Sequence, residues 1–160
     1  MTPIVVEVAP DAADLRYMAA RDLRYRVLRA PLGRPRGSEE NAHEAESRHW
    51  VVLGEGGAVI ACCMLHVRPE EDSGARVGKL MQMAVEPALA GQGVGRTLVE
   101  AVVTAAARAD CASVVLHARE TAAGFYARCG CAVEGDPFTE VGLPHRRMRW
   151  HPPARRAPGS

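Results

Sequence analysis

The segment AGQGVGRTL, residues 90–98, places three glycines at alternating positions: Gly91, Gly93 and Gly95. The apolar run KLMQMAV precedes it, and a long stretch with apolar residues at helical spacing follows it. The glycines therefore lie between an expected strand and an expected helix. Bare backbone at a helix N-terminus brings several free N–H groups close to an anion. The segment predicts a phosphate-binding loop, with a glycine turn that holds no ligand as the alternative.

Spacing argues against two common phosphate loops. A P-loop requires G-x-x-x-x-G-K-[ST], but here Ala90 replaces the first glycine and Arg96 replaces the lysine. A dinucleotide fingerprint requires G-x-G-x-x-G, and its third glycine would fall on Arg96 or Leu98. A P-loop nucleotide-binding protein and a Rossmann domain are therefore disfavoured.

Composition narrows the class of protein. The chain has 160 residues, of which 48% are hydrophobic and 24% charged, as in a single globular domain. Its net charge of +1 favours neither a nucleic acid nor an acidic partner. The odd number of cysteines, five, lacks any C-x-x-C spacing, and no export signal or long apolar span is present. We therefore expect reduced thiols, a cytoplasmic location and no membrane association. His43 and His49 lack metal-ligand spacing, so no metal is expected.

The pattern along the chain is strand, helix, loop, three strands, helix, strand, helix and two strands. Asp11 is expected to cap the first helix, which runs to about Arg29, and the polar segment 31–47 is expected to form a loop or a short irregular helix. The other expected elements are a hairpin over 49–67, strands at 3–8, 76–85, 113–118, 131–135 and 146–150, and helices at 94–109 and 120–129. We expect residues 1–151 to form the domain and residues 152–160 to form a disordered tail.

Two long segments, MAVEPALAGQGVGRTL (83–98) and VVLHARETAAGFYARCGC (114–131), resemble the GNAT superfamily of N-acetyltransferases. The family's glycine-loop pattern, [RQ]-x-x-G-x-[GA], matches residues 90–95 except at Ala90, which removes a side-chain contact but keeps the backbone amides. The Phe125-Tyr126 pair followed by Gly130 matches a second motif. The segment DPFTEVGLPHRRMRW (136–150) is similar to the small bacterial ElaA-type subgroup, and the likeness extends over about residues 20–150.

The resemblance implies a single α/β (α+β) domain with a mixed, mostly antiparallel central sheet flanked by helices. It also implies acetyl-CoA as cosubstrate. The glycine loop would hold the pyrophosphate of coenzyme A, and the strand before it would hold the pantetheine arm. The implied cofactor-binding residues are Met83, Ala84, Val85, Gly91, Gln92, Gly93, Val94, Gly95, Arg96 and Arg119.

The resemblance also suggests catalytic residues. Tyr126 matches the family tyrosine that gives a proton to the departing thiolate, and the alternative is an aromatic side chain packed in the core. His117, Glu46 and Glu140 are candidates for the base that deprotonates the substrate ammonium. Deprotonation through water, with no single base, stays open. His145 could line the acceptor site.

The function expected is direct transfer of an acetyl group from acetyl-CoA to a primary amine, of a small molecule or a peptide, in a ternary complex. The alternative is a non-catalytic acyl-CoA-binding module that senses or regulates. A homodimer is left open. The segments 31–47 and 136–148 should shape the acceptor site, and their carboxylates favour a cationic amine.

Overall fold

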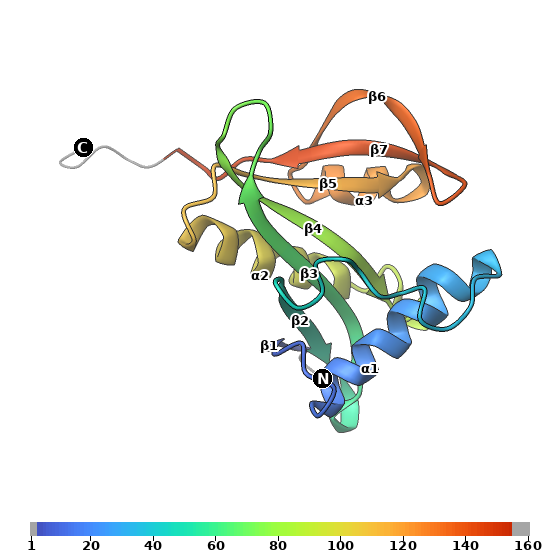
Figure 1. Ribbon diagram of the computed structural model, residues 1–160. Coiled ribbons are helices and arrows are strands. Elements are labelled where there is room, and N and C mark those ends of the chain that lie inside the picture. Colours follow the sequence, from blue (N-terminus) through green and yellow to red (C-terminus); the bar gives the residue numbers. More distant parts are fainter. Residues whose placement is uncertain (1–2, 155–160) are drawn as a thin grey trace.

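The computed structural model describes residues 3–154. These residues form one seven-stranded sheet with the strand order β1-β2-β3-β4-β5-β7-β6 (Figure 1). Neighbouring strands are antiparallel, except that β4 and β5 run parallel. The strands are β1 (Ile4–Val8), β2 (Arg48–Leu53), β3 (Val59–Pro69), β4 (Arg76–Val85), β5 (Ser113–Arg119), β6 (Ala132–Glu140) and β7 (Leu143–Trp150). The expectation of a mixed, mostly antiparallel sheet is confirmed.

Helices cover both faces of this sheet. They are α1 (Leu15–Arg24), α2 (Val94–Arg108) and α3 (Ala123–Arg128). Alternation along β3 shows which face each helix covers, because successive strand residues point to opposite faces. Cys62 packs in the core beneath α1, whereas Ala61 and Cys63 pack in the larger core beneath α2 and α3. Both cysteines are buried and free, as expected.

The parallel strands β4 and β5 separate along their length. They pair only where Val77–Leu80 lies beside Ser113–Leu116. Beyond Leu80 the register between β3 and β4 shifts, and Gln82 adopts a positive φ of 56°. Such an irregularity bends a strand away from its neighbour. Figure 1 shows β4 and β5 diverging along their length, so the sheet opens between them.

The first helix begins later than expected. Asp14, not Asp11, is its N-cap, and the Asp14 carboxylate accepts hydrogen bonds from the amides of Arg16 and Tyr17. The Asp11 carboxylate instead accepts from the Ala13 amide and closes a turn before the helix. Asp is common both at helix N-caps and in turns, and it occurs at positions 11 and 14. The sequence alone therefore did not show which of the two caps the helix.

The C-terminal hairpin is longer than expected. The sequence predicted strands at 131–135 and 146–150, but β6 and β7 extend until only Val141 and Gly142 separate them. Both turn residues have positive φ, 48° and 76°, as a two-residue hairpin turn of the primed type requires. A β-branched residue rarely adopts this conformation, which concealed the turn. The extended hairpin places Glu140 across from Leu143 and Phe138 across from His145.

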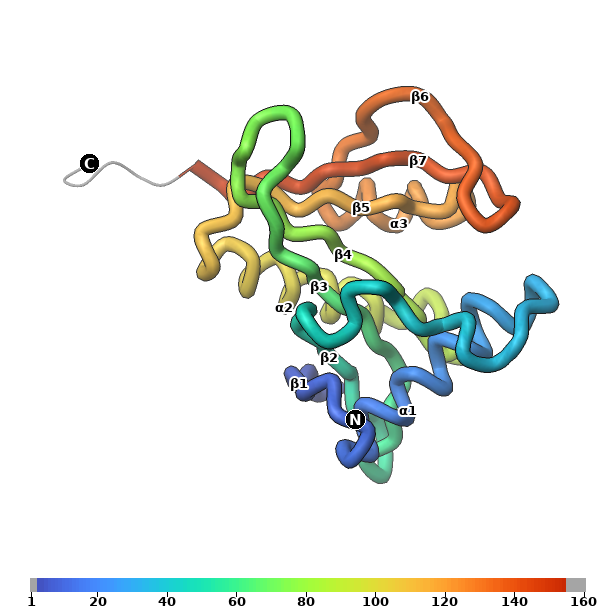
Figure 2. The backbone as a smooth tube through the Cα atoms, in the orientation of Figure 1, coloured from blue at the N-terminus to red at the C-terminus, as the bar shows by residue number. Residues whose placement is uncertain are grey.

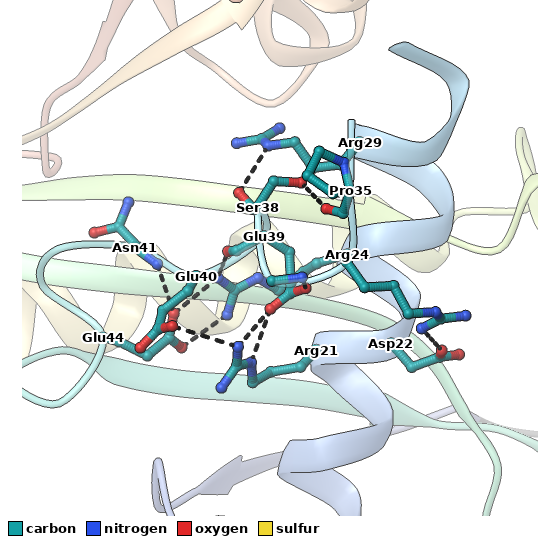
Figure 3. A network of polar contacts seen from close by, with 12 residues as sticks. Arg21, Asp22, Arg24, Arg29, Pro35, Ser38, Glu39, Glu40, Asn41 and Glu44 are labelled. Carbon is teal, nitrogen blue, oxygen red and sulfur yellow. Dashed lines mark hydrogen bonds and ion pairs between the residues drawn. The ribbon is translucent and has the colours of Figure 1, made fainter. Parts of the chain in front are cut away.

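The polar segment after α1 is held by buried charges. It continues α1 as a π-helical turn (Tyr25–Arg29) and a 3₁₀ turn (Ala30–Leu32), then runs back toward β2 (Figure 2). Arg24, only 2% exposed, donates from its two terminal nitrogens to the two carboxylate oxygens of Glu44, both at 2.8 Å (Figure 3). Tyr17 donates to the same carboxylate at 2.8 Å, and Arg21 pairs with the Glu39 carboxylate. Glu39 and Glu44 therefore pair with arginines of α1. They are not available to bind a substrate, so they no longer favour a cationic acceptor.

The hydrogen bonds of Glu44 should make the free energy of unfolding depend on pH in the acid range. Burial by itself raises the pKa of the Glu44 carboxyl, but the Arg24 guanidinium and the Tyr17 hydroxyl outweigh it and lower that pKa from 4.5 to about 2. Because the folded pKa lies below the unfolded one, the stabilisation is complete above pH 4.5 and is lost as the pH falls toward 2. We expect the free energy of unfolding, measured in urea, to fall across this window more steeply in the wild type than in Glu44→Gln. Equal pH slopes for the two proteins would contradict this assignment.

The C-terminal segment 152–154 has no regular secondary structure. The rest of the expected tail, 155–160, lies outside the described residues. Among residues 3–154, none of the helices has the length and apolar content needed to cross a bilayer.

Candidate active site

A cavity of about 440 Å³ lies where β4 and β5 separate. Its walls come from the end of the α1 segment, the polar loop, β4, β5, α3 and the β6–β7 hairpin. The lining residues are Leu28, Arg29, Asn41, Lys79–Met83, Val85, Leu116–Arg119, Ala122, Phe125, Tyr126, Glu140, Val141 and His145. The cavity thus brings together Tyr126, His117 and Glu140, three of the four expected catalytic residues.

The glycine loop sits at the start of α2, as expected. Gly91 and Gly93 have φ of 79° and 82°, a region that glycine enters without strain. A Cβ atom at either position would meet no atom within 4 Å, so a ligand can approach this backbone. Gly93 is the N-cap of α2, and no side chain caps the helix there. The first amides of α2 are therefore available to an anion.

Two residues of the glycine loop, Gln92 and Gly95, make contacts within the protein that the sequence did not predict. The Gln92 amide, expected to contact phosphate, donates to the Leu89 carbonyl at 3.3 Å. A Cβ atom at Gly95 would lie 3.1 Å from the Phe125 ring. The third glycine therefore allows α2 to pack closely against α3, whereas Gly91 and Gly93 leave the backbone open.

The end of β4 offers a free edge to the opening. Met83 and Val85 line the cavity, whereas Ala84 is buried in the core beneath α1. On one side this part of β4 pairs with β3, through Ala84 with Cys62 and Val85 with Ala61. On the other side β5 does not pair with it, so its peptide groups face the opening. A pantetheine arm, which carries two amide groups, could add to this edge as a strand would.

A His–Glu–His cluster lies at the hairpin side of the cavity. The His117 Nδ1 atom lies 3.0 Å from Glu140 Oε1, and His145 Nε2 lies 3.6 Å from Glu140 Oε2. His145 is 3% exposed, and its Nδ1 donates to the Leu143 carbonyl at 2.8 Å. Burial lowers the pKa of His117, and Lys79 acts in the same direction, while the hydrogen bond to Glu140 opposes both. His117 is therefore neutral at pH 7 and can accept a proton.

Tyr126 reaches the cavity from α3. It is 7% exposed and packs against Phe125, with a distance of 5.0 Å between the ring centroids. Burial raises the pKa of its phenol well above the usual value. The group therefore keeps its proton at neutral pH, which a general acid requires.

The two remaining expected side chains, Arg119 and Glu46, differ in their relation to the cavity. Arg119 lines the cavity and donates to the Leu28 carbonyl at 3.0 Å, which ties the end of β5 to the segment after α1. The Glu46 side chain is 65% exposed, does not line the cavity, and lies 3.7 Å from His43 Nδ1. The fold therefore separates Glu46 from the other candidate bases.

The fold also forms a cluster that sequence spacing missed. His43, Glu46 and His66 place possible ligand atoms within 4.8 Å of one another, because His66 comes from β3. The two imidazole rings are stacked, with centroids 4.1 Å apart and planes 12° from parallel. Their in-plane lone pairs therefore run side by side and do not converge on one point, so this arrangement does not suit a shared metal ion. The absence of a metal stays a prediction.

Arg29 and Lys79 line the cavity although sequence reasoning did not select either of them. Lys79 is the only lysine of the chain and lies on a strand, where a half-buried cation is an informative exception. Arg29 carries no comparable signal, because arginines occur throughout the preceding helix.

Comparison with known proteins agrees with this geometry. Residues 13–131 match the model of the acetyltransferase (GNAT) family. ElaA of Escherichia coli has a similar fold, with a TM-score of 0.76 and 18% identity over 94% of this chain and 100% of that one. An acyl-CoA N-acyltransferase from Pseudomonas aeruginosa gives a TM-score of 0.74 and 23% identity over 93% and 99%. A Lactobacillus plantarum protein described as an N-acetyltransferase gives 0.77 and 24% over 94% and 99%. The family match covers most of the chain and includes both the glycine loop and Tyr126, so this protein belongs to the GNAT family of acetyltransferases, enzymes that use acyl-CoA.

Proposed function

We propose that this enzyme transfers an acetyl group from acetyl-CoA directly to a primary amine, without an acyl-enzyme intermediate. The observation that carries this proposal is the cavity between β4 and β5, which joins an open backbone edge, a buried phenol and a neutral histidine. No cysteine lines this cavity among the described residues, so direct transfer fits better than a thioester on the protein.

The cosubstrate fits the features of the opening. Its pyrophosphate would bind the amides of Gly93, Val94, Gly95 and Arg96, since Gly91 and Gly93 leave that backbone uncovered. Its pantetheine arm would run along the free edge of Met83–Val85. The thioester would then lie beside Tyr126 in the cavity.

The proton transfers can be assigned to the cavity residues. His117, held through Nδ1 by Glu140, takes a proton from the substrate ammonium at Nε2, and Glu140 stabilises the resulting imidazolium. The amine nitrogen then bonds to the thioester carbon, the carbon–sulfur bond breaks, and the nitrogen loses its second proton to water, which leaves a neutral amide. Tyr126 gives its proton to the departing thiolate, and solvent restores the protonation of His117 and Tyr126. A cytoplasmic location remains part of the proposal.

Release of free CoA thiol tests the function. Acetyl-CoA is mixed with the protein and a panel of amines, amino acids, polyamines and peptides, and the thiol is followed with a chromogenic reagent. Release that depends on an amine supports the transferase. Tight acetyl-CoA binding without release by any amine would favour the alternative, a non-catalytic acyl-CoA-binding module.

A glycine-loop variant tests the cofactor site separately. We expect Gly93→Val to weaken CoA binding about tenfold or more, because a hydrogen bond to a charged group contributes about 1.5–3 kcal/mol. The added side chain both strains the loop, at a φ of 82°, and covers the amides. Gly57→Val is the matched control, because Gly57 has a φ of 78°, equally open surroundings and a place in the β2–β3 turn. Titration calorimetry would contradict the site if both folded variants bound CoA like the wild type.

A further inference from the structure

The two faces of the sheet divide the cavity between cosubstrate and acceptor. Leu116 and Ala118 of β5 are buried in the core beneath α2 and α3. His117 and Arg119 alternate with them and therefore point to the opposite face, which α1 covers. The glycine loop begins α2 and thus belongs to the first face. If CoA enters from the glycine loop, the face with His117 and Arg119 is left for the acceptor.

The charges on the acceptor side are mostly positive. Arg29, Lys79 and Arg119 line the cavity, and Glu140 is the one carboxylate among the described lining residues. Within residues 3–154, no carboxylate lies within 4.0 Å of the Arg29 or Arg119 guanidinium. Their hydrogen bonds go to neutral peptide oxygens: Arg29 donates to Ser38 at 3.3 Å and to Leu28 at 3.2 Å, and Arg119 also donates to Leu28.

Arg29 differs in this respect from the arginines before it. Arg21, Arg24 and Arg26 each pair with a carboxylate. In Figure 3 the Arg29 guanidinium lies apart from the Glu39 and Glu44 carboxylates. Burial lowers the pKa of Arg29, and the neighbouring cations, Arg119 first among them, lower it further. A half-buried cation beside other cations is unfavourable unless an anion joins it. Glu140 acts on Arg29 in the opposite direction but does not outweigh these effects, and within residues 3–154 no carboxylate lies close enough to pair with Arg29, so a ligand is the natural source of a paired anion.

We propose that the acceptor is a small amine that also carries a carboxylate, such as a free amino acid, and that Arg29 binds this carboxylate with help from Arg119. The proposal rests on the proposed function. The amino group of such an acceptor would point toward Glu140 and His117, so its two opposite charges would match the two ends of the acceptor side. A polyamine would place further positive charge beside three cations, and a peptide N-terminus would bring no adjacent carboxylate.

Matched acceptors test the proposal. The acceptors are a set of L-amino acids, their carboxamides and their decarboxylated amines, and kcat/KM is measured by thiol release at saturating acetyl-CoA. We expect the wild type to prefer the amino acids by about 10- to 100-fold, the range for a charge-assisted hydrogen bond to an ion. In Arg29→Gln this preference should disappear, with little change for the carboxamides, and Arg29→Lys should keep part of it. Arg34→Gln is the control, since Arg34 is exposed, belongs to the same segment and does not line the cavity.

Three outcomes would overturn the inference in distinguishable ways. Equal or better use of carboxamides and amines by the wild type would refute it while leaving the acetyltransferase function intact. Weaker CoA binding by folded Arg29→Gln would assign this side chain to the cosubstrate. Thiol release with none of the acceptors would refute the proposed function itself and this inference with it. The wild-type comparison stands even if the variant fails to fold.

Discussion

The Tyr126→Phe variant should lose a factor of about 10²–10⁴ in kcat, the usual contribution of general acid catalysis. The substitution removes one hydroxyl and keeps the ring, which contacts Phe125 and belongs to the core beneath α2 and α3. Acetyl-CoA affinity, measured by calorimetry, should therefore change little. The rate should fall because the CoA thiolate then has to leave without receiving a proton from Tyr126.

The choice of acyl donor gives a second readout of this role. A more acidic thiol leaves as a thiolate with less need of a proton. The difference in kcat between wild type and Tyr126→Phe should therefore shrink with an acyl donor that carries such a thiol. Tyr25→Phe is a suitable control, because the Tyr25 hydroxyl donates to the Arg34 carbonyl and does not line the cavity. A folded Tyr126→Phe variant with full kcat on a true substrate would remove Tyr126 from the mechanism and leave water to protonate the thiolate.

Loss of either partner in the Arg24–Glu44 pair should destabilise the fold by about 3–5 kcal/mol, because the remaining charge is buried and unpaired. For a chain of this size, that corresponds to a fall in Tm of about 6–20 °C. Arg24 is 3% exposed and Glu44 11% exposed at the side chain, so water cannot replace the missing partner. Urea unfolding of Arg24→Met and Glu44→Leu, singly and together, measures the effect. The double variant should recover much of the loss, since it leaves no unpaired charge.

The Arg26–Glu86 pair provides the comparison. It has the same distance of 2.8 Å, but its side chains are 43% and 29% exposed. Such a pair contributes only about 0–1 kcal/mol, so Glu86→Gln should cost little. Similar losses at both pairs would show that burial does not set the strength of the Arg24–Glu44 interaction.

The sequence predicted best those features that depend on nearby residues. Apolar runs indicated β3, β4 and β5, and the glycines of 91–95 marked the start of α2. Features set by distant contacts could not be read in the same way. Whether Glu44 faced a substrate or Arg24 depended on how the loop folds back on α1, and local composition is the same in both cases.

The candidate site shows the same limit. The family motif located Tyr126 and the glycine loop, but the contact between His117 and Glu140 exists because the turn at Val141-Gly142 lengthens the hairpin. The positive φ of Val141 contradicts its intrinsic preference and is imposed by the strands on either side. Arg29 enters the cavity through the π-helical turn, a form that residue periodicity does not indicate.

The close packing of Gly95 against Phe125 links two ends of the same cosubstrate. Gly95 lies in the loop assigned to the pyrophosphate, and Phe125 adjoins the tyrosine assigned to the sulfur. A methyl group at position 95 would lie 3.1 Å from the Phe125 ring, so this ring, on the helix that carries Tyr126, would have to give way by a few tenths of an ångström. The spacing between the sites proposed for phosphate and thiolate thus depends on an absent side chain, and we expect a larger residue at position 95 to need a smaller one at position 125.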